Sequence, residues 1–244
     1  MVKYIFLGVV QGLTEFFPVS SSGHLVILDN IFGLGANALV LTVVLHLGTS
    51  LALIVFFFKD ILQMLRSIKF ITLIAITTVI TGIIGLTFKD FFESLFNSPK
   101  LVACAMLVTA VILFLTRKFM MAKKDRVSVK DAAILGFTQA IAIIPGISRS
   151  GITISTLLFR KVDRDSAFRF SFLVSIPVVL GAALLEAKDI KFSMQSGCIA
   201  GFIASFLAGL LALYILKSIL HRAKFYYFGY YCVLVALLTL LFIK

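Results

Sequence analysis

QGLTEFFPVSSSGHL, from Gln11 to Leu25, is a serine-rich polar stretch inside a chain that is otherwise strongly apolar. A second stretch, QAIAIIPGISRSGIT from Gln139 to Thr153, resembles it. Polar groups at bilayer depth cost several kcal/mol, so they are usually functional. At one constant offset of 128 residues the chain matches Gly8 with Gly136, Gln11 with Gln139, Ser20 with Ser148, Ser22 with Ser150, and Gly23 with Gly151. The match indicates an internal repeat.

Composition places the chain in the membrane. It has 244 residues, of which 61% are hydrophobic, with a mean hydropathy of +1.11. Soluble domains are about 45–50% apolar. The net charge of +12 comes from basic residues that mostly lie in short loops between apolar runs. Such loops determine the orientation of the spans in the membrane. We therefore predict one integral membrane domain over residues 1–244, with the lipid bilayer as a partner, no nucleic acid, and a homodimer as an open option.

Six apolar runs are long enough to cross a hydrocarbon core of ~30 Å, which takes about 20 helical residues. They cover residues 39–58, 70–88, 101–116, 166–186, 196–216 and 225–243. The loops between the runs alternate between basic and weakly charged, and basic loops stay cytoplasmic. We expect both chain termini to lie outside.

The region 131–160 does not fit a single crossing, because basic clusters flank it on both sides. A helix pair that enters from the cytoplasm and returns keeps both clusters inside, and Pro145 and Gly146 break the pattern where it would turn. The first segment breaks likewise, at Pro18 and at residues 20–23, and would enter from the outside.

Each half then contains one re-entrant pair and three spans, so the second half is inverted relative to the first. The sequence predicts an all-α polytopic membrane protein with six transmembrane helices plus two re-entrant helix pairs. The inverted repeats cover approximately residues 1–118 and 129–244. Proteins of this architecture place their sites near the midplane, at the repeat interface. We therefore expect the two polar turns to meet and line a cavity.

Gln11 and Glu15 are four residues apart and share one helix face. A carboxylate and an amide so placed can hold a divalent cation loosely or position a water molecule. They can equally form a buried polar pair that hydrogen-bonds between helices. By itself this spacing is a weak signal.

Three consecutive serines, Ser20, Ser21 and Ser22, precede an apolar stretch together with His24. A hydroxyl can cap the following helix, and the free N–H groups at the helix start suit an oxyanion. One serine would suffice for capping. His24 can act as acid, base or nucleophile near neutral pH, although a lone histidine can also be structural.

The second segment repeats this pattern but has Arg149 where the first has Ser21. Its planar guanidinium matches phosphate oxygens in a bidentate manner. A buried salt bridge to Glu15 is the alternative, but carboxylates are scarce nearby, so an exogenous anion is the better partner. The segment's polar residues are Ser148, Arg149, Ser150 and Thr153.

The predicted cavity holds one arginine, one carboxylate, one histidine and several hydroxyls, which favours phosphate. Lateral access between spans favours a lipid, so a lipid phosphate or diphosphate is the natural substrate or cargo. His46, which heads the run HLGTSLALIVFFF, either supports this site or serves only as an interhelical contact.

The runs from Gly12 to His24 and from Pro145 to Thr153 resemble the two signatures of the bacitracin-resistance family of undecaprenyl-diphosphate phosphatases. The stretch from His46 to Thr49 is also similar, and the likeness covers essentially the full chain. The resemblance implies an enzyme that removes the terminal phosphate from undecaprenyl (C55) diphosphate. The product, undecaprenyl phosphate, is the lipid carrier for cell-wall synthesis, and its recycling confers bacitracin resistance.

The resemblance further implies a multi-pass protein of the plasma membrane, with a site that faces the outer leaflet and depends on Mg²⁺ or Ca²⁺. It assigns the catalytic roles to Glu15, Ser21, His24 and Arg149. The substrate contacts would be Gln11, Ser20, Ser22, Ser148, Ser150 and Thr153. The metal would be held by Glu15 and Gln11. Gln11 stands where many members carry glutamate, and an amide neither acts as a base nor brings negative charge.

In the mechanism we expect, Arg149 and the cation neutralise charge while a nucleophile attacks in line. Ser21 is the first choice of nucleophile and His24 the second, with Glu15 orienting or deprotonating the attacking group. A flippase for polyprenyl phosphate is the alternative function, because inverted repeats suit it equally. A flippase needs an anion clamp but no nucleophile and base.

Overall fold

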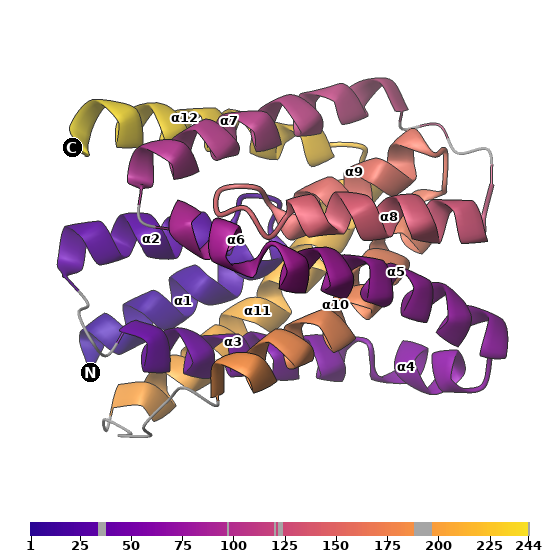
Figure 1. The fold of residues 1–244 in the computed structure, drawn as a ribbon, viewed down its shortest axis with the longest axis horizontal. Helices are drawn as coiled ribbons and strands as arrows, with labels where there is room; N and C mark the ends of the chain where they lie inside the picture. The colour runs from indigo at the N-terminus through magenta and orange to yellow at the C-terminus, as the bar shows by residue number, and fades with distance from the viewer. Residues whose placement is uncertain (34–37, 97, 120, 122–123, 188–196, 244) are drawn as a thin grey trace.

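The computed structural model describes residues 1–33, 38–96, 98–119, 121, 124–187 and 197–243. These residues form helices and contain no strand, only an isolated bridge between Lys124 and Val162. Figure 1 shows the helices running roughly along one direction, with both termini at the same end. The α-helices are α1 (Val2–Phe16), α2 (Ser21–Phe32), α3 (Ala38–Phe56), α4 (Phe58–Leu65), α5 (Ile68–Thr87), α6 (Lys89–Leu95), α7 (Pro99–Thr116), α8 (Val129–Ile141), α9 (Arg149–Phe159), α10 (Arg164–Ala187), α11 (Gly197–His221) and α12 (Phe228–Phe242).

All six apolar runs are helical, as α3, α5, α7, α10, α11 and α12, with ends within five residues of the predicted ones. Residue 196, which begins one predicted run, lies outside the described residues. Within the described chain, four helices are long and apolar enough to cross a membrane: α5, α7 with its 3₁₀ extension, α11, and α12 with the turn before it. The bent pair of α3 and α4, with a 70° angle at the break, raises the number to five.

Two segments expected as plain loops are short helices instead. α4 occupies much of the basic loop after α3, and α6 follows α5 directly. Phe58, Leu62 and Leu65 lie on one side of α4 at a spacing of three to four residues, and all three are exposed. Such a helix suits the membrane–water boundary, where its apolar side enters lipid and its charged side faces water.

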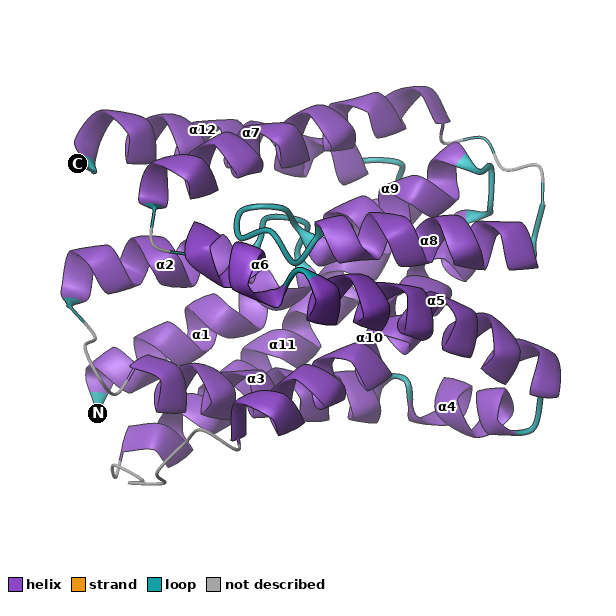
Figure 2. Cartoon of the chain, in the orientation of Figure 1, coloured by secondary structure: helices purple, strands orange, loops and turns teal. Residues whose placement is uncertain are grey.

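The two polar segments form helical hairpins, α1 with α2 and α8 with α9. Figure 2 shows their turns together at the centre of the molecule, surrounded by helices. The Gly146 N–H donates to Ser20 Oγ at 3.1 Å, and Ser150 Oγ donates to the Phe17 carbonyl at 3.2 Å. The prediction that the turns meet is confirmed.

Each hairpin packs its first helix against a long helix of the other half, α1 on α11 and α8 on α5. Gly8 and Gly136, which match in the repeat, lie at these crossings. A Cβ at Gly8 would lie 2.4 Å from the Gly201 carbonyl oxygen, and one at Gly136 would lie 2.8 Å from the Ile80 Cβ. Small residues let helix backbones approach closely inside membranes, so these glycines fix the position of both hairpins.

The start of α8 is anchored by a buried carboxylate. Asp131 accepts from Lys124 Nζ at 2.5 Å and from Arg160 Nε at 2.8 Å, and it forms a capping box with Ser128. Burial raises the pKa of this carboxyl, but the hydrogen bonds from Lys124, Ser128 and Arg160 outweigh it and hold the pKa well below its usual range. The cluster ties α8 to the end of α9.

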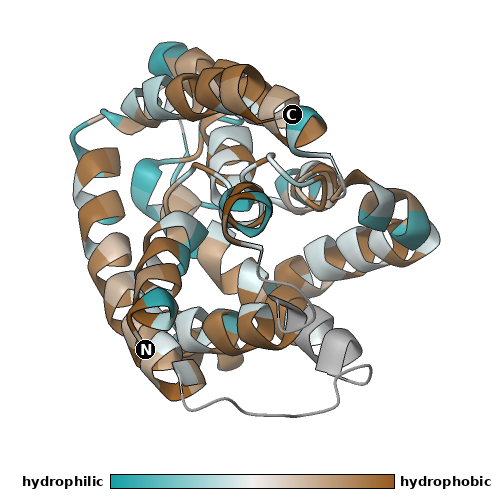
Figure 3. Cartoon of the chain, turned by 90° about the vertical axis from the view of Figure 1, so that its left-hand side faces the viewer, coloured by the Kyte–Doolittle hydropathy of each residue, from teal (hydrophilic) through white to brown (hydrophobic). Residues whose placement is uncertain are grey.

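The outer surface is apolar along the long helices. Figure 3, an end-on view, shows hydrophobic ribbon dominating the surrounding helices. The exposed side chains include Val79, Ile83, Leu86, Ile199, Ile203, Leu207, Leu211, Leu234, Leu237 and Leu241. A continuous apolar surface of this extent marks contact with a membrane or another protein, and the span lengths favour a membrane.

Candidate active site

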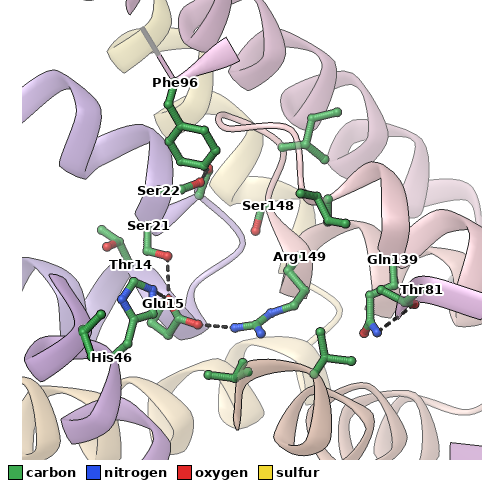
Figure 4. Close-up of a pocket in the computed structure, with 17 residues that line it drawn as sticks. Thr14, Glu15, Ser21, Ser22, His46, Thr81, Phe96, Gln139, Ser148 and Arg149 are labelled. Carbon is green, nitrogen blue, oxygen red and sulfur yellow. Dashed lines mark hydrogen bonds and ion pairs between the residues drawn. The ribbon is translucent and has the colours of Figure 1, made fainter. Parts of the chain in front are cut away.

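A pocket of about 240 Å³ lies where the two hairpin turns meet. Figure 4 shows side chains from both hairpins converging on it. Its polar wall combines residues far apart in the sequence: Thr14, Glu15, Ser20, Ser21, Ser22, His46, Thr81, Gln139, Ser148 and Arg149. Its apolar wall consists of Val43, Phe96, Ala142, Ile143, Ile147, Val178 and Val179. Pockets that enclose a drug-sized ligand measure about 300–1,000 Å³, so this one suits a headgroup.

Ser20 and Ser148, which match in the repeat, each cap the second helix of their hairpin. Ser20 caps α2 by accepting from the Gly23 N–H at 3.2 Å, and Ser148 caps α9 by accepting from the Gly151 N–H at 3.1 Å. Ser20 has a φ of +66°, a conformation that costs about 1–3 kcal/mol outside glycine. Its bond from the Gly146 N–H, across the hairpin interface, helps to hold that conformation. Two helix starts therefore face one pocket.

Both helix starts also need glycine at the third position. A Cβ on Gly23 would lie 3.3 Å from the Gly146 Cα, and one on Gly151 would lie 3.3 Å from the Pro18 Cβ. Each distance is tighter than ordinary van der Waals contact, because each turn presses against the other hairpin. Gly23 and Gly151 therefore leave room for the capping serine of their own turn, 3.2 and 3.0 Å from such a Cβ, and for the other hairpin.

Glu15 is the centre of the polar cluster. Ser21 Oγ donates to Glu15 Oε2 at 2.6 Å, and Gln11 Nε2 donates to the same oxygen at 3.1 Å. Arg149 binds the other carboxylate oxygen, Oε1. The side chain of Glu15 is only 5% exposed and that of Arg149 24%. The predicted alternative of a Glu15–Arg149 ion pair is therefore present, and it brings the proposed nucleophile, base and clamp together.

His46 joins this cluster from α3. Its Nε2 lies 3.6 Å from Glu15 Oε2, and its Nδ1 lies 2.9 Å from the Thr42 carbonyl oxygen. A carbonyl can only accept, so Nδ1 carries a hydrogen and Nε2 faces the carboxylate. The sequence singled out His46 without deciding between a supporting and an interhelical role, and the structure places it in the pocket wall.

The remaining predicted residues divide between the pocket and its supports. Ser22 and Ser148 line the pocket, whereas Ser150 donates to the Phe17 carbonyl and joins the hairpins. Thr153 Oγ1 donates to the Arg149 carbonyl at 2.8 Å, within its own helix, and does not line the pocket.

His24 lies apart from the lining residues. Its Nδ1 is 2.7 Å from the Ser20 carbonyl oxygen and its Nε2 is 2.8 Å from the hydroxyl oxygen of Tyr231 in α12. The two rings stack, with centroids 5.7 Å apart. Both ring nitrogens are thus occupied, and the side chain supports the turn that carries Ser20 and Ser21.

Gln139 and Thr81 are lining residues that received no role from the sequence. Gln139 Nε2 donates to Thr81 Oγ1 at 3.2 Å. Gln139 was visible as the repeat partner of Gln11, and that match was a usable signal. Thr81 lies within an apolar span, where nothing in the sequence distinguishes it.

The donor set suits a cation only in part. The described residues contain no group of three or more His, Cys, Asp or Glu side chains that could hold a metal. Glu15 supplies one carboxylate, and the adjacent Gln11 Oε1 is buried without a partner. Mg²⁺ is commonly held by one or two carboxylates with substrate phosphates and water, so the residues fit a cation shared with a phosphate ligand.

Fold and pocket together define a polytopic helical membrane protein with a polar pocket between two helical hairpins. The chain belongs to the family described as Bacitracin resistance protein BacA, whose model matches residues 4–238. Relatives named undecaprenyl-diphosphatase cover nearly the whole chain. The relative from Halothermothrix orenii is 40% identical over 98% of this chain and 96% of its own, and that from Thermotoga petrophila is 42% identical over 97% and 98%. A relative from Methanococcus maripaludis is 39% identical over 99% of this chain and 100% of its own.

Proposed function

We propose that this chain hydrolyses undecaprenyl diphosphate to undecaprenyl phosphate and inorganic phosphate, and so recycles a lipid carrier. The observation that carries the proposal is the contact of Ser21 and Arg149 with one buried carboxylate, Glu15. The side chains that we propose as nucleophile, base and anion clamp converge there from two hairpins. The family and the names of its members point the same way.

Ser21 is the proposed nucleophile and Glu15 its base. The hydroxyl already donates to Glu15 Oε2 at 2.6 Å, so its proton can pass to the carboxylate as Oγ attacks the terminal phosphorus. Arg149 binds the phosphate oxygens and neutralises charge as the anhydride bond breaks. His24, whose ring nitrogens are both engaged, is the second choice of nucleophile and supports the turn.

The proposed cation is Mg²⁺ or Ca²⁺, held by Glu15 and Gln11 together with the substrate. When bound it would supply positive charge to the diphosphate oxygens. The unpartnered Gln11 Oε1 beside Glu15 supports this assignment. Ser20, Ser22, Ser148, Ser150 and Thr153 are the proposed contacts or supports of the bound phosphate.

In the membrane we propose six transmembrane helices and two re-entrant hairpins, arranged as inverted repeats over residues 1–118 and 129–244. The packing of α1 on α11 and of α8 on α5 supports this arrangement, because equivalent helices make equivalent contacts. Both termini and the entry to the pocket would face the outside of the plasma membrane. The apolar lining residues Phe96, Val178 and Val179 would meet the first isoprene units of the lipid.

The test is the release of inorganic phosphate by purified protein in detergent. We expect release from undecaprenyl diphosphate that stops with a chelator and returns when Mg²⁺ or Ca²⁺ is added. Undecaprenyl phosphate should appear in equal amount. If folded protein releases no phosphate with any of several divalent cations, the proposed hydrolytic function is wrong, and the result favours transport of the lipid.

A further inference from the structure

Gln139 is a buried polar residue in the pocket wall that the proposed chemistry leaves without a role. Its residue exposure is 2%, and its amide oxygen has no hydrogen-bond partner. A glutamine amide has two N–H donors and a carbonyl acceptor, and here one donor reaches Thr81 Oγ1 at 3.2 Å. Buried polar atoms are normally hydrogen-bonded. The unpaired amide oxygen of this lining residue therefore suits a ligand that can donate a hydrogen bond.

The ligand of that acceptor cannot be a fully ionised phosphate, because two oxygens that both accept would repel each other. A water molecule donates two hydrogen bonds and satisfies the requirement. The overall reaction also consumes one water, whichever group attacks first. The chemistry of the unpaired oxygen and the needs of the hydrolysis therefore point to the same molecule.

The place of Gln139 relative to Ser21 supports this reading. In Figure 4, Ser21 and Glu15 lie on one side of Arg149 and Gln139 lies on the other. A phosphoryl group bound by Arg149 between these two sides would have the nucleophile on one face and the amide on the opposite face. In-line transfer places the attacking and leaving atoms on opposite sides of the phosphorus. Water that hydrolyses a phosphoserine at Ser21 must therefore approach from the face where Gln139 lies.

We infer that Gln139, held by Thr81, positions the water that hydrolyses a phosphoserine intermediate on Ser21. This inference rests on the proposed function and adds a second half-reaction to it. The fixed contact with Thr81 is what makes Gln139 suitable. Thr81 Oγ1 donates to the Gly136 carbonyl at 3.0 Å, so its lone pairs remain available to the amide and set the direction of the amide oxygen.

The two half-reactions balance as follows. In the first, the Ser21 Oγ–P bond forms and the anhydride P–O bond breaks, the electron pair stays on the departing lipid phosphate, and the hydroxyl proton passes to Glu15. In the second, the water oxygen bonds to phosphorus, the Oγ–P bond breaks, and Glu15 returns its proton to Oγ. Both hydrogens of the water leave with the inorganic phosphate. Gln139 accepts a hydrogen bond from the water and exchanges no proton.

The test compares substitutions at Gln139 in the full-length protein. Gln139→Met keeps the size of the side chain and removes the amide, whereas Gln139→Glu keeps an acceptor oxygen. With substrate labelled at the terminal phosphate, we expect Gln139→Met to lower steady-state phosphate release at least about tenfold. Undecaprenyl phosphate should appear in an initial burst equal to the enzyme, and acid-quenched protein should carry the label on Ser21. Gln139→Glu should release phosphate faster than Gln139→Met.

Two controls separate this inference from its foundation. Thr138 is the neighbour of Gln139 in α8; it accepts a hydrogen bond from Thr156 and does not line the pocket. The Thr138→Val protein should release phosphate at a rate within about twofold of wild type. Gln11→Met removes the matching glutamine beside Glu15 and should slow release without accumulation of label. If wild type releases phosphate and Gln139→Met does so equally fast, or slowly with neither burst nor label, the inference is wrong. If wild type itself releases none, the proposed function fails.

Discussion

Replacement of Arg149 by lysine separates a shaped clamp from a simple positive charge. Lysine keeps the charge but loses the planar fork, so it cannot bind Glu15 and two phosphate oxygens in the same geometry. An arginine that neutralises a transferring phosphoryl group is worth about 10³–10⁵ in rate. Loss of a single oriented donor at such a site costs about 10²–10³. We expect Arg149→Ala to lower the rate by about 10³–10⁵ and Arg149→Lys to lower it by about 10²–10³.

These factors correspond to free energies of activation. At about 1.4 kcal/mol per factor of ten, the lysine variant loses about 3–4 kcal/mol of transition-state stabilisation and the alanine variant about 4–7 kcal/mol. Arg149→Ala also leaves the Glu15 carboxylate, 5% exposed, without its cation. Breaking a buried pair in this way costs about 3–5 kcal/mol of folding free energy, so the alanine variant should also unfold at a lower temperature.

The assay is the initial rate of phosphate release from undecaprenyl diphosphate at saturating substrate, with thermal unfolding measured on the same samples. Arg169→Lys is the matched control, because Arg169 pairs with Asp60 and does not line the pocket. It should retain activity within about twofold of wild type. An Arg149→Lys protein that folds and hydrolyses the lipid at the wild-type rate would refute the clamp.

Three further changes test other parts of the structure. Ser21→Ala should lower the rate at least about 10³-fold with little change in thermal unfolding, as expected for a nucleophile; a rate near wild type would exclude it. Gly12→Ala should cost about 1–3 kcal/mol of stability, because its Cβ would lie 2.6 Å from the Ser205 carbonyl oxygen, and an unchanged unfolding temperature would contradict this packing. Asp131→Asn should be less stable than wild type at pH 7 by about 1–3 kcal/mol. The pKa of Asp131 is lowered on folding, so its contribution is present above the ordinary carboxyl pKa of 3.8 and is lost as the pH falls below it. A wild-type advantage that grew below that pH would have the wrong sign.

Much of this fold could be predicted from local sequence. Apolar runs of about 20 residues identify spans, and the paired breaks at Pro18 and Pro145 identify the hairpins. The constant offset between the segments then predicts that equivalent serines play equivalent parts, as Ser20 and Ser148 do at the two helix starts. These features depend on short-range patterns, which a single sequence contains.

Other features depend on contacts between distant segments and could not be predicted. His24 stood beside the serines in the sequence, but the Tyr231 hydroxyl, 207 residues away, engages its ring nitrogen outside the pocket. Gln139 and Thr81 form a pair only because α8 packs on α5. α4 lies in a segment that the sequence predicts as a basic loop, because its apolar face is short and its charged residues dominate the pattern. For His24 and Gln139 the missing information was which helices are neighbours.

We place the hydrolysis in one pocket that both hairpins build. The most direct test is the rate of phosphate release from undecaprenyl diphosphate by wild type, Ser21→Ala and Arg149→Ala in parallel, one variant from each hairpin. We predict that wild type converts the lipid fully, with one phosphate released per molecule, and that each variant loses at least about 10³-fold while remaining folded enough to assay. Substantial hydrolysis by either variant would show that the reaction does not depend on both hairpins.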